Sequence, residues 1–193
     1  MGYVVAAALG YLLGSIPVAL IVARRHGVDL RATGDGNPGA WNALEQLGAR
    51  AALPVFLGDA GKAFIAALAG RALEGWWGGY AAVAGAMVGH AFPLFAGFRG
   101  GKSVMCFVGG GIALSPLAGA ICLALCCAVT VARSFAWGAR VGVFAFPVVQ
   151  LATDPVTHVI GTGALMCLIG LLFAVQPRRS APARSAPGAA PRA

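Results

Sequence analysis

Long apolar stretches constrain this chain more than any other feature. Three of them, Tyr3 to Ala23, Ala51 to Ala69 and Trp76 to Phe95, exceed 18 residues. Such a stretch is typical of a membrane-spanning helix, because about 20 residues rising about 1.5 Å each cross the hydrocarbon core. Of the 193 residues, 59% are hydrophobic and 10% are charged, which leaves too little polar surface for a water-soluble domain. The sequence therefore predicts an all-α integral membrane protein.

Three further apolar stretches follow, and the first of them is ambiguous. They are Ser103 to Val131, Phe135 to Leu151 and Val156 to Val175. As a single helix the first would be about 45 Å long, against a hydrocarbon core of about 30 Å. Ser115-Pro116 near its middle predicts a break, since the residue before a proline disfavours the helical conformation. The chain therefore has six helices if this stretch is continuous and seven if it is broken.

The basic residues favour seven helices. Lys and Arg between membrane helices collect on the cytoplasmic side. With seven helices and the N-terminus outside, only Arg71 falls on the outer side, whereas six helices would split the last arginines across the membrane. We expect a polytopic bundle of about seven transmembrane helices with a cytoplasmic C-terminus. The net charge of +8 then reports orientation rather than binding to nucleic acid.

The chain divides into a membrane domain, residues 1–175, and a tail, residues 176–193. The tail, QPRRSAPARSAPGAAPRA, has the low-complexity Pro/Ala/Arg composition that predicts disorder. Its arginines suit either anionic lipid or plain solvation. The first apolar stretch lacks a small-residue cleavage site followed by a soluble domain, so we interpret it as an anchor rather than a removed signal peptide.

Two polar segments should emerge together on the cytoplasmic face. The first, RRHGVDLRATGDGNPGAWN, occupies residues 24–42 and has glycines at 34, 36 and 39 with polar residues between them. Such a loop can wrap an anion with exposed N–H groups. The same residue types also form ordinary turns, so both interpretations stay open.

The second polar segment, GHAFPLFAGFRGGKS, occupies residues 89–103. Its end, AGFRGGKS, resembles a nucleotide-binding P-loop, but Ala96 replaces the first glycine and an apolar helix precedes it in place of a buried strand. His90 near a helix end, followed by Gly100, Gly101 and Lys102, instead favours contact with a phosphate group. A lone histidine in an apolar helix is also compatible with simple packing.

Asp59 and Lys62 are charged residues within an apolar helix. Such groups are costly in a membrane, so they face the bundle interior and pair. Their spacing of three allows them simply to pair with each other, and support of a site is the alternative. The five cysteines all lie in apolar stretches without nearby histidine or carboxylate partners, so we predict neither a disulfide nor a metal site.

Taken in order, these motifs resemble those of the bacterial membrane acyl-phosphate:glycerol-3-phosphate acyltransferases. They are GSIP at 14–17, GDGNPGAWN at 34–42, Asp59 with Lys62, and GHAFPLFAGFRGGKS at 89–103. The resemblance implies acyl transfer from acyl phosphate to the 1-hydroxyl of glycerol 3-phosphate, giving lysophosphatidic acid for phospholipid synthesis. It implies a multi-pass protein of the bacterial plasma (inner) membrane that needs no cofactor. Its partners would be the two substrates, membrane lipid and other enzymes of phospholipid synthesis.

The resemblance also assigns site residues. It implies catalytic roles for Asn37, His90 and Lys102, and support from Asp59 and Lys62. The residues that it implies for phosphate binding are Gly36, Gly39, Asn42, Gly100, Gly101, Lys102 and Ser103.

The chain departs from the family pattern at several positions. Asp35 stands where the family has Ser, Glu45 where it has Arg, and Ser103 where it has Gly. The closing helix ends in AVQPRRSAPARS, without the family's His-x-x-Asn motif. These changes introduce two anions near a predicted phosphate site. The alternative function is therefore a non-catalytic homologue that binds a lipid or a partner enzyme.

Overall fold

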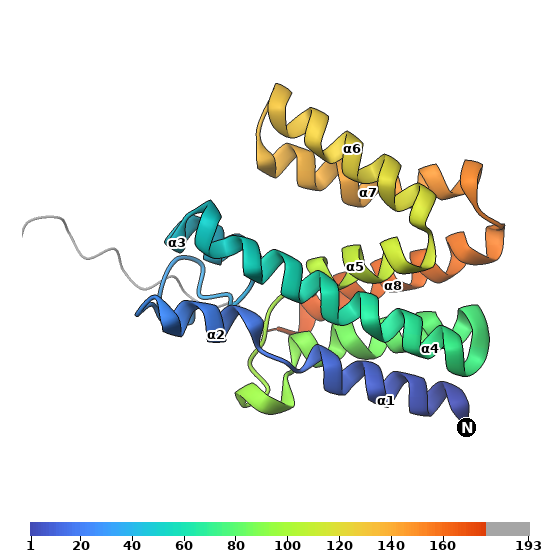
Figure 1. Ribbon diagram of the computed structural model, residues 1–193, viewed down its shortest axis with the longest axis horizontal. Helices are drawn as coiled ribbons and strands as arrows, with labels where there is room; N and C mark the ends of the chain where they lie inside the picture. Colours follow the sequence, from blue (N-terminus) through green and yellow to red (C-terminus); the bar gives the residue numbers. More distant parts are fainter. Residues whose placement is uncertain (177–193) are drawn as a thin grey trace, which may run out of the picture.

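The computed structural model describes residues 1–176, and every regular element among them is a helix (Figure 1). This confirms the predicted all-α class. The elements are α1 (Gly2–Gly14), α2 (Val18–Arg25), α3 (Ala40–Leu47), α4 (Ala49–Ala91), η1 (Leu94–Ala96), α5 (Val104–Leu114), α6 (Pro116–Ala132), α7 (Phe135–Thr153) and α8 (Val156–Val175).

Element α4 is a helical hairpin rather than one rod. The chain leaves the helical conformation at Glu74 and Gly75, where Gly75 has φ 62° and ψ −156°, and then reverses. A positive φ of this kind favours glycine. The two halves correspond to the second and third predicted membrane helices. They pack closely enough that a Cβ on Gly70 would collide with the carbonyl oxygen of Gly78.

The first membrane segment, Gly2–Arg25, contains a break that the sequence analysis did not predict. α1 ends at Gly14 and α2 begins at Val18, because Pro17 has no N–H to donate and disfavours a helical conformation at Ile16. The carbonyl oxygen of Ile16 within the break accepts a hydrogen bond from Lys62 Nζ at 3.0 Å. The break is thus tied to α4.

Small residues hold α1 against the second half of α4. Cβ atoms on Gly10 and Gly14 of α1 would collide with carbonyl oxygens of α4, and Cβ atoms on Gly85 and Gly89 of α4 would collide with carbonyl oxygens of α1. Close backbone approach through small residues is a common way for membrane helices to associate. It fixes the α1–α2 break beside the C-terminal end of α4.

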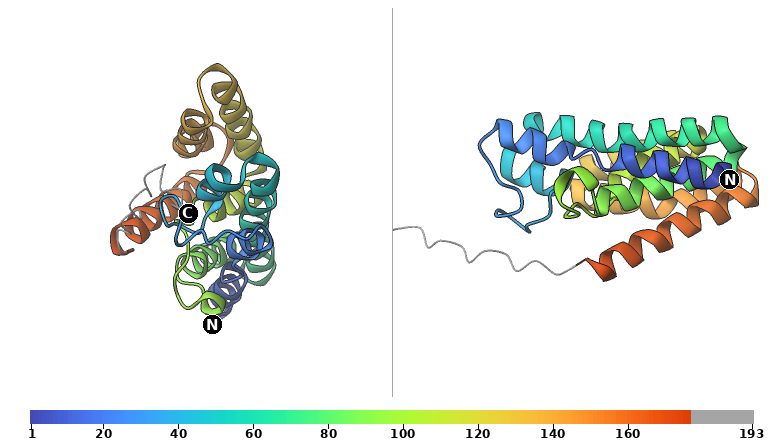
Figure 2. Two further views of the ribbon diagram at one scale, coloured as in Figure 1. Left: turned by 90° about the vertical axis from the view of Figure 1, so that its left-hand side faces the viewer. Right: turned by 90° about the horizontal axis from the view of Figure 1, so that it is seen from below.

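The predicted break at Ser115 is confirmed, and it separates α5 from α6. The Ser115 hydroxyl donates to Asp154 Oδ1 at 3.0 Å and accepts from the amide of Gln150 at 2.6 Å. These bonds anchor the turn to the end of α7. From there α6 and α7 form a hairpin that stands apart from α4 and α5, as two views show (Figures 1 and 2).

The described residues form a bundle of seven apolar segments: α1 with α2, the two halves of α4, α5, α6, α7 and α8. By length and composition alone, four stretches can cross a membrane, and one of them contains the reversal in α4. The short helix α3 was not predicted, because its first residues belong to the polar segment 24–42, which we interpreted as a loop. It follows Gly39, ends before Gly48 at φ 78°, and buries Ala40, Asn42 and Ala43.

Candidate active site

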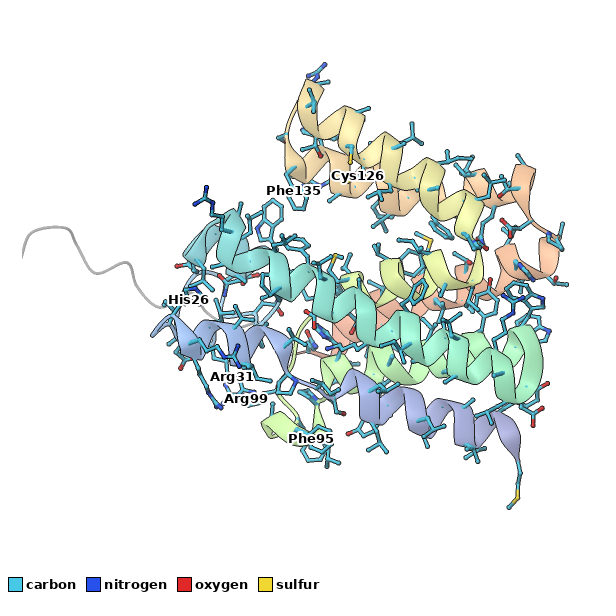
Figure 3. All side chains as sticks on the ribbon, viewed as in Figure 1. His26, Arg31, Phe95, Arg99, Cys126 and Phe135 are labelled. Atoms are coloured by element: carbon cyan, nitrogen blue, oxygen red, sulfur yellow. The ribbon has the colours of Figure 1, made fainter. Side chains whose placement is uncertain are left out.

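The two polar loops meet at one end of the bundle, as predicted. One nitrogen of the Arg31 guanidinium, Nη2, donates to the carbonyl oxygens of Ala96 and Arg99, each at 2.6 Å. Figure 3 shows Arg31 and Arg99 together at this end. Burial, and next the charge of Arg99, lower the pKa of Arg31. Arg31 therefore clamps the first loop to the second.

Asn42 shapes the first loop from beneath. Its side chain is fully buried, and its amide donates to the carbonyl oxygens of Leu30, Thr33 and Asn37 at 3.0, 3.0 and 3.1 Å. Gly34 and Gly36 take positive φ values between these anchors. The structure thus gives Asn42, predicted to bind phosphate, a loop-shaping position, while the Asn37 side chain lines the cavity described below.

The glycines of both loops use their N–H groups within the chain. Gly100 and Gly101 donate to the carbonyl oxygens of Ala91 and His90, and Gly36 and Gly39 donate to those of Thr33 and Asn37. A Cβ on Gly100 would collide with the His90 carbonyl, and one on Gly101 with the His90 ring. Gly100 and Gly101 are required for close approach, and the N–H groups of all four glycines bond carbonyl oxygens of the chain.

Ser103 also points inward. It has φ 61°, and its buried hydroxyl donates to the carbonyl oxygen of Met87 at 2.6 Å. The hydroxyl therefore fastens the start of α5 to α4. Of the predicted groups in the second loop, the Lys102 ammonium remains exposed to a ligand.

Lys102 and Asp35 form an ion pair across the two loops. Lys102 Nζ lies 3.1 Å from Asp35 Oδ2, and the two side chains are 41% and 39% exposed. Glu45 is exposed on α3, one turn beyond Trp41, but it does not line the cavity. One of the two unexpected anions thus contacts the central cation, and the other lies further away.

Beneath the loops, Asp59, Lys62 and His90 form a buried cluster. Lys62 Nζ lies 2.8 Å from Asp59 Oδ1 and 2.8 Å from His90 Nδ1, and Asp59 Oδ1 lies 3.4 Å from His90 Nδ1. The predicted pairing of Asp59 with Lys62 is confirmed. Both members of the pair also contact His90.

Asp59 and His90 of this cluster line one end of a cavity of about 380 Å³. The polar residues that line it are Asp35, Asn37, Asp59, His90, Lys102 and Arg140, and the rest of its lining is mostly apolar. A second, almost wholly apolar cavity of about 200 Å³ lies between α5 and the α6–α7 hairpin. The two cavities share five lining residues: Phe56, Val104, Met105, Phe135 and Ala139.

Sequence reasoning missed the aromatic wall between the cavities. Phe135 stacks on Trp41 and meets Phe56 edge to face, with ring centroids 5.6 Å apart in each pair. Figure 3 shows Phe135 on the side of the hairpin that faces the bundle. The only sequence signal was an aromatic residue at the end of an apolar stretch.

The C-terminal end of α8 was also missed. Phe173 lines the larger cavity, with its ring centroid 5.5 Å from Lys102 Nζ. Gln176, which composition placed at the start of the tail, donates to the carbonyl oxygen of Gly101 at 2.7 Å. The rest of the predicted tail lies outside the described residues. α8 thus closes the site although the family's closing motif is missing.

A cation and a histidine at the head of an apolar cavity define a membrane enzyme that joins a phosphorylated compound to a lipid chain. The family model for Glycerol-3-phosphate acyltransferase matches residues 4–182. The chain belongs to the glycerol-3-phosphate acyltransferase family, and the predicted family and its function are confirmed.

Curated relatives and solved structures support the same family. The chain is 36% identical to a Clostridioides difficile glycerol-3-phosphate acyltransferase over 77% of each chain, and 35% identical to that of Geobacter sulfurreducens over 84% of each. The match to a Symbiobacterium thermophilum relative is 49% identical and spans 49% of it. A crystal structure of PlsY (YgiH) in its glycerol 3-phosphate form superposes with TM-score 0.78 and 27% identity, covering 93% of this chain and 96% of that one. The lysophosphatidic acid form gives TM-score 0.76 at 26% identity, covering 94% of this chain and 97% of that one.

Proposed function

We propose that this protein transfers a fatty acyl group from acyl phosphate to the 1-hydroxyl of glycerol 3-phosphate, giving lysophosphatidic acid. The observation that carries this proposal is that the two cavities are adjacent and share five lining residues. Lys102 and His90 stand at the polar end, and the apolar end lies between helices that face lipid. Such a site suits one phosphorylated substrate from water and one acyl chain from the bilayer.

The chemistry needs positioning and charge stabilisation. The 1-hydroxyl oxygen bonds to the acyl carbonyl carbon, the bond from that carbon to the phosphate oxygen breaks, and the hydroxyl proton goes to the departing phosphate. Acyl phosphate is already activated, so no covalent acyl-enzyme is required. Lys102 stabilises the negative charge on phosphate, and Asn37 orients the substrate beside it.

The apolar cavity holds the acyl chain. Ile112 and Gly119 line it, and the Phe107–Phe146 pair, with ring centroids 5.9 Å apart, forms part of its wall. Cys126 on α6 also lines it, whereas its neighbour Cys127 is exposed on the outer surface of the hairpin. Bulk added at position 126 should therefore shorten the cavity.

In the test, the purified protein is given labelled glycerol 3-phosphate. The acyl donor is acyl phosphate, acyl-CoA or acyl carrier protein, each in short- and long-chain forms. We expect lysophosphatidic acid from acyl phosphate. We also expect Cys126→Phe to lower the ratio of long- to short-chain kcat/KM by about tenfold, since overpacking an apolar site costs about 1–3 kcal/mol.

Cys127→Phe is the matched control, because it adds the same bulk on the lipid-facing side. Product from acyl-CoA at the rate of acyl phosphate would refute the proposed acyl donor. Equal chain-length profiles for the two variants would show that the acyl chain lies elsewhere.

The proposed orientation in the bacterial plasma membrane puts both loops in the cytoplasm and the N-terminus outside. Arg31, Arg99 and Lys102 belong to the loop end, whereas Arg71 precedes the reversal of α4 at the opposite end. This arrangement supports the orientation by the positive-inside rule. Reporter fusions at Met1 and Ala193 should report opposite compartments, and a shared compartment would contradict the proposal.

A further inference from the structure

Lys62 has all of its hydrogen-bonding capacity in use. An ammonium group carries three N–H donors and no acceptor. Lys62 Nζ has three acceptors: the Ile16 carbonyl oxygen at 3.0 Å, Asp59 Oδ1 at 2.8 Å and His90 Nδ1 at 2.8 Å. His90 Nδ1 is therefore an acceptor, and it cannot carry a proton while it accepts from an ammonium group.

The proton shared by Lys62 and His90 belongs to the lysine. An amine is more basic than an imidazole by about four pKa units in water. A proton on Nδ1 would have to donate to Asp59 Oδ1, which lies 3.4 Å away, beyond the 2.8 Å that separates Nδ1 from Lys62 Nζ. Protonating both residues would also leave two buried cations with one carboxylate, and uncompensated buried charge is costly.

With Nδ1 accepting, the imidazole is neutral and its proton sits on Nε2. This edge of the ring faces the second loop, where a Cβ on Gly101 would collide with Nε2. Among residues 1–176, no hydrogen-bond partner of Nε2 is found, and His90 lines the same cavity as Lys102. Nε2–H is thus a fixed donor that no protein group uses.

We propose that Lys62 is a positioning residue that holds His90 as the neutral Nε2–H tautomer, so that Nε2–H donates to a phosphate oxygen of the substrate beside Lys102. The tautomer follows from contacts within the chain. The identity of the ligand rests on the proposed function. Lys62 thereby links the α1–α2 break, through Ile16, to the protonation state of a group in the site.

The tautomer can be read without any assay of activity. Nitrogen-15 NMR of the detergent-solubilised protein distinguishes protonated from unprotonated imidazole nitrogens. The chain has 3 histidines, and the signal that disappears in His90→Gln identifies His90. We expect unprotonated Nδ1 and protonated Nε2 in the wild type. In Lys62→Met, the proton should move to Nδ1, because Asp59 is then its nearest charged partner, whereas Lys62→Arg should keep the wild-type pattern.

The use of Nε2–H is tested by two isosteric replacements. The amide nitrogen of glutamine reaches the position of Nε2, and that of asparagine reaches the position of Nδ1. His90→Gln should therefore bind glycerol 3-phosphate within a few-fold of wild type by calorimetry. His90→Asn should bind about 10- to 100-fold more weakly, as expected for loss of a hydrogen bond to a charged group.

Protonated Nδ1 in the wild type, or a tautomer unchanged in a folded Lys62→Met variant, would overturn the role of Lys62. If Lys62→Met does not fold, the wild-type spectrum still tests the tautomer, and the variants His90→Gln and His90→Asn still test the contact with phosphate. Equal affinity of the two His90 variants would remove Nε2–H from the phosphate site. An Nε2–H tautomer in a protein that makes no lysophosphatidic acid would instead refute the proposed function alone.

Discussion

Replacing Lys102 with alanine is expected to lower kcat/KM for glycerol 3-phosphate by about 100- to 1000-fold, the usual effect of removing one group that stabilises a developing charge. Lys102 lines the polar head of the cavity, and it is partly exposed beside Asp35. The glycine N–H groups around it are engaged within the loops. They cannot replace its charge without a rearrangement of the loops.

Steady-state kinetics and calorimetry with glycerol 3-phosphate would measure this effect. Arg50→Ala is the matched control, because Arg50 is an exposed cation at the loop end that does not line the cavity. Its activity should stay within about twofold of wild type, since exposed charges distant from a site are screened. A Lys102→Ala variant as active as Arg50→Ala would remove the second loop from the site.

The second large effect should be a gain in affinity for glycerol 3-phosphate. Asp35→Ser combined with Glu45→Arg is expected to tighten glycerol 3-phosphate binding by about 30-fold. Asp35 competes with the substrate phosphate for Lys102, and its own pairing is weak because both side chains are partly exposed. Removing the two anions together is worth about 2 kcal/mol, of which Asp35 contributes the larger part.

The single variants separate the two positions. Because only Asp35 touches Lys102, Asp35→Ser should give the larger part of the gain. Glu45→Arg should contribute mainly when Asp35 is already replaced, which would appear as a coupling energy in a double-mutant cycle. A folded double variant that binds no better than wild type would place the phosphate elsewhere and favour the non-catalytic alternative.

The fold could be predicted largely from apolar length and charge. The segments before and after residue 75 read as separate helices, and Ser115-Pro116 marked a true break. The break at Pro17 was missed, although the proline was visible, because prolines are tolerated inside many membrane helices. The helix is interrupted at this proline because of tertiary contacts, namely the packing of α1 on α4 and the hydrogen bond from Lys62 to Ile16.

The site could be predicted in part. Its two loops were found because alternation across the membrane puts them on one side. The residues that came from elsewhere, such as Phe56, Phe135 and Phe173, reach the site only through tertiary packing. The glycines were found, but the bonds of their N–H groups to carbonyl oxygens of the chain were not predicted. Composition cannot tell whether an N–H group bonds a ligand or a carbonyl oxygen of its own loop.

The contacts of Lys62 also bear on how such a chain can change during evolution. Loss of Lys62 would leave Asp59 buried without its cation, which costs about 3–5 kcal/mol, and would remove the bond that ties the α1–α2 break to α4. Selection for a folded protein alone would therefore preserve this lysine. A descendant that had lost all activity would still carry Asp59 and Lys62, so this pair marks ancestry. Evidence of turnover has to come from positions at which substitutions do not destabilise the fold. Lys102 is the clearest of these positions.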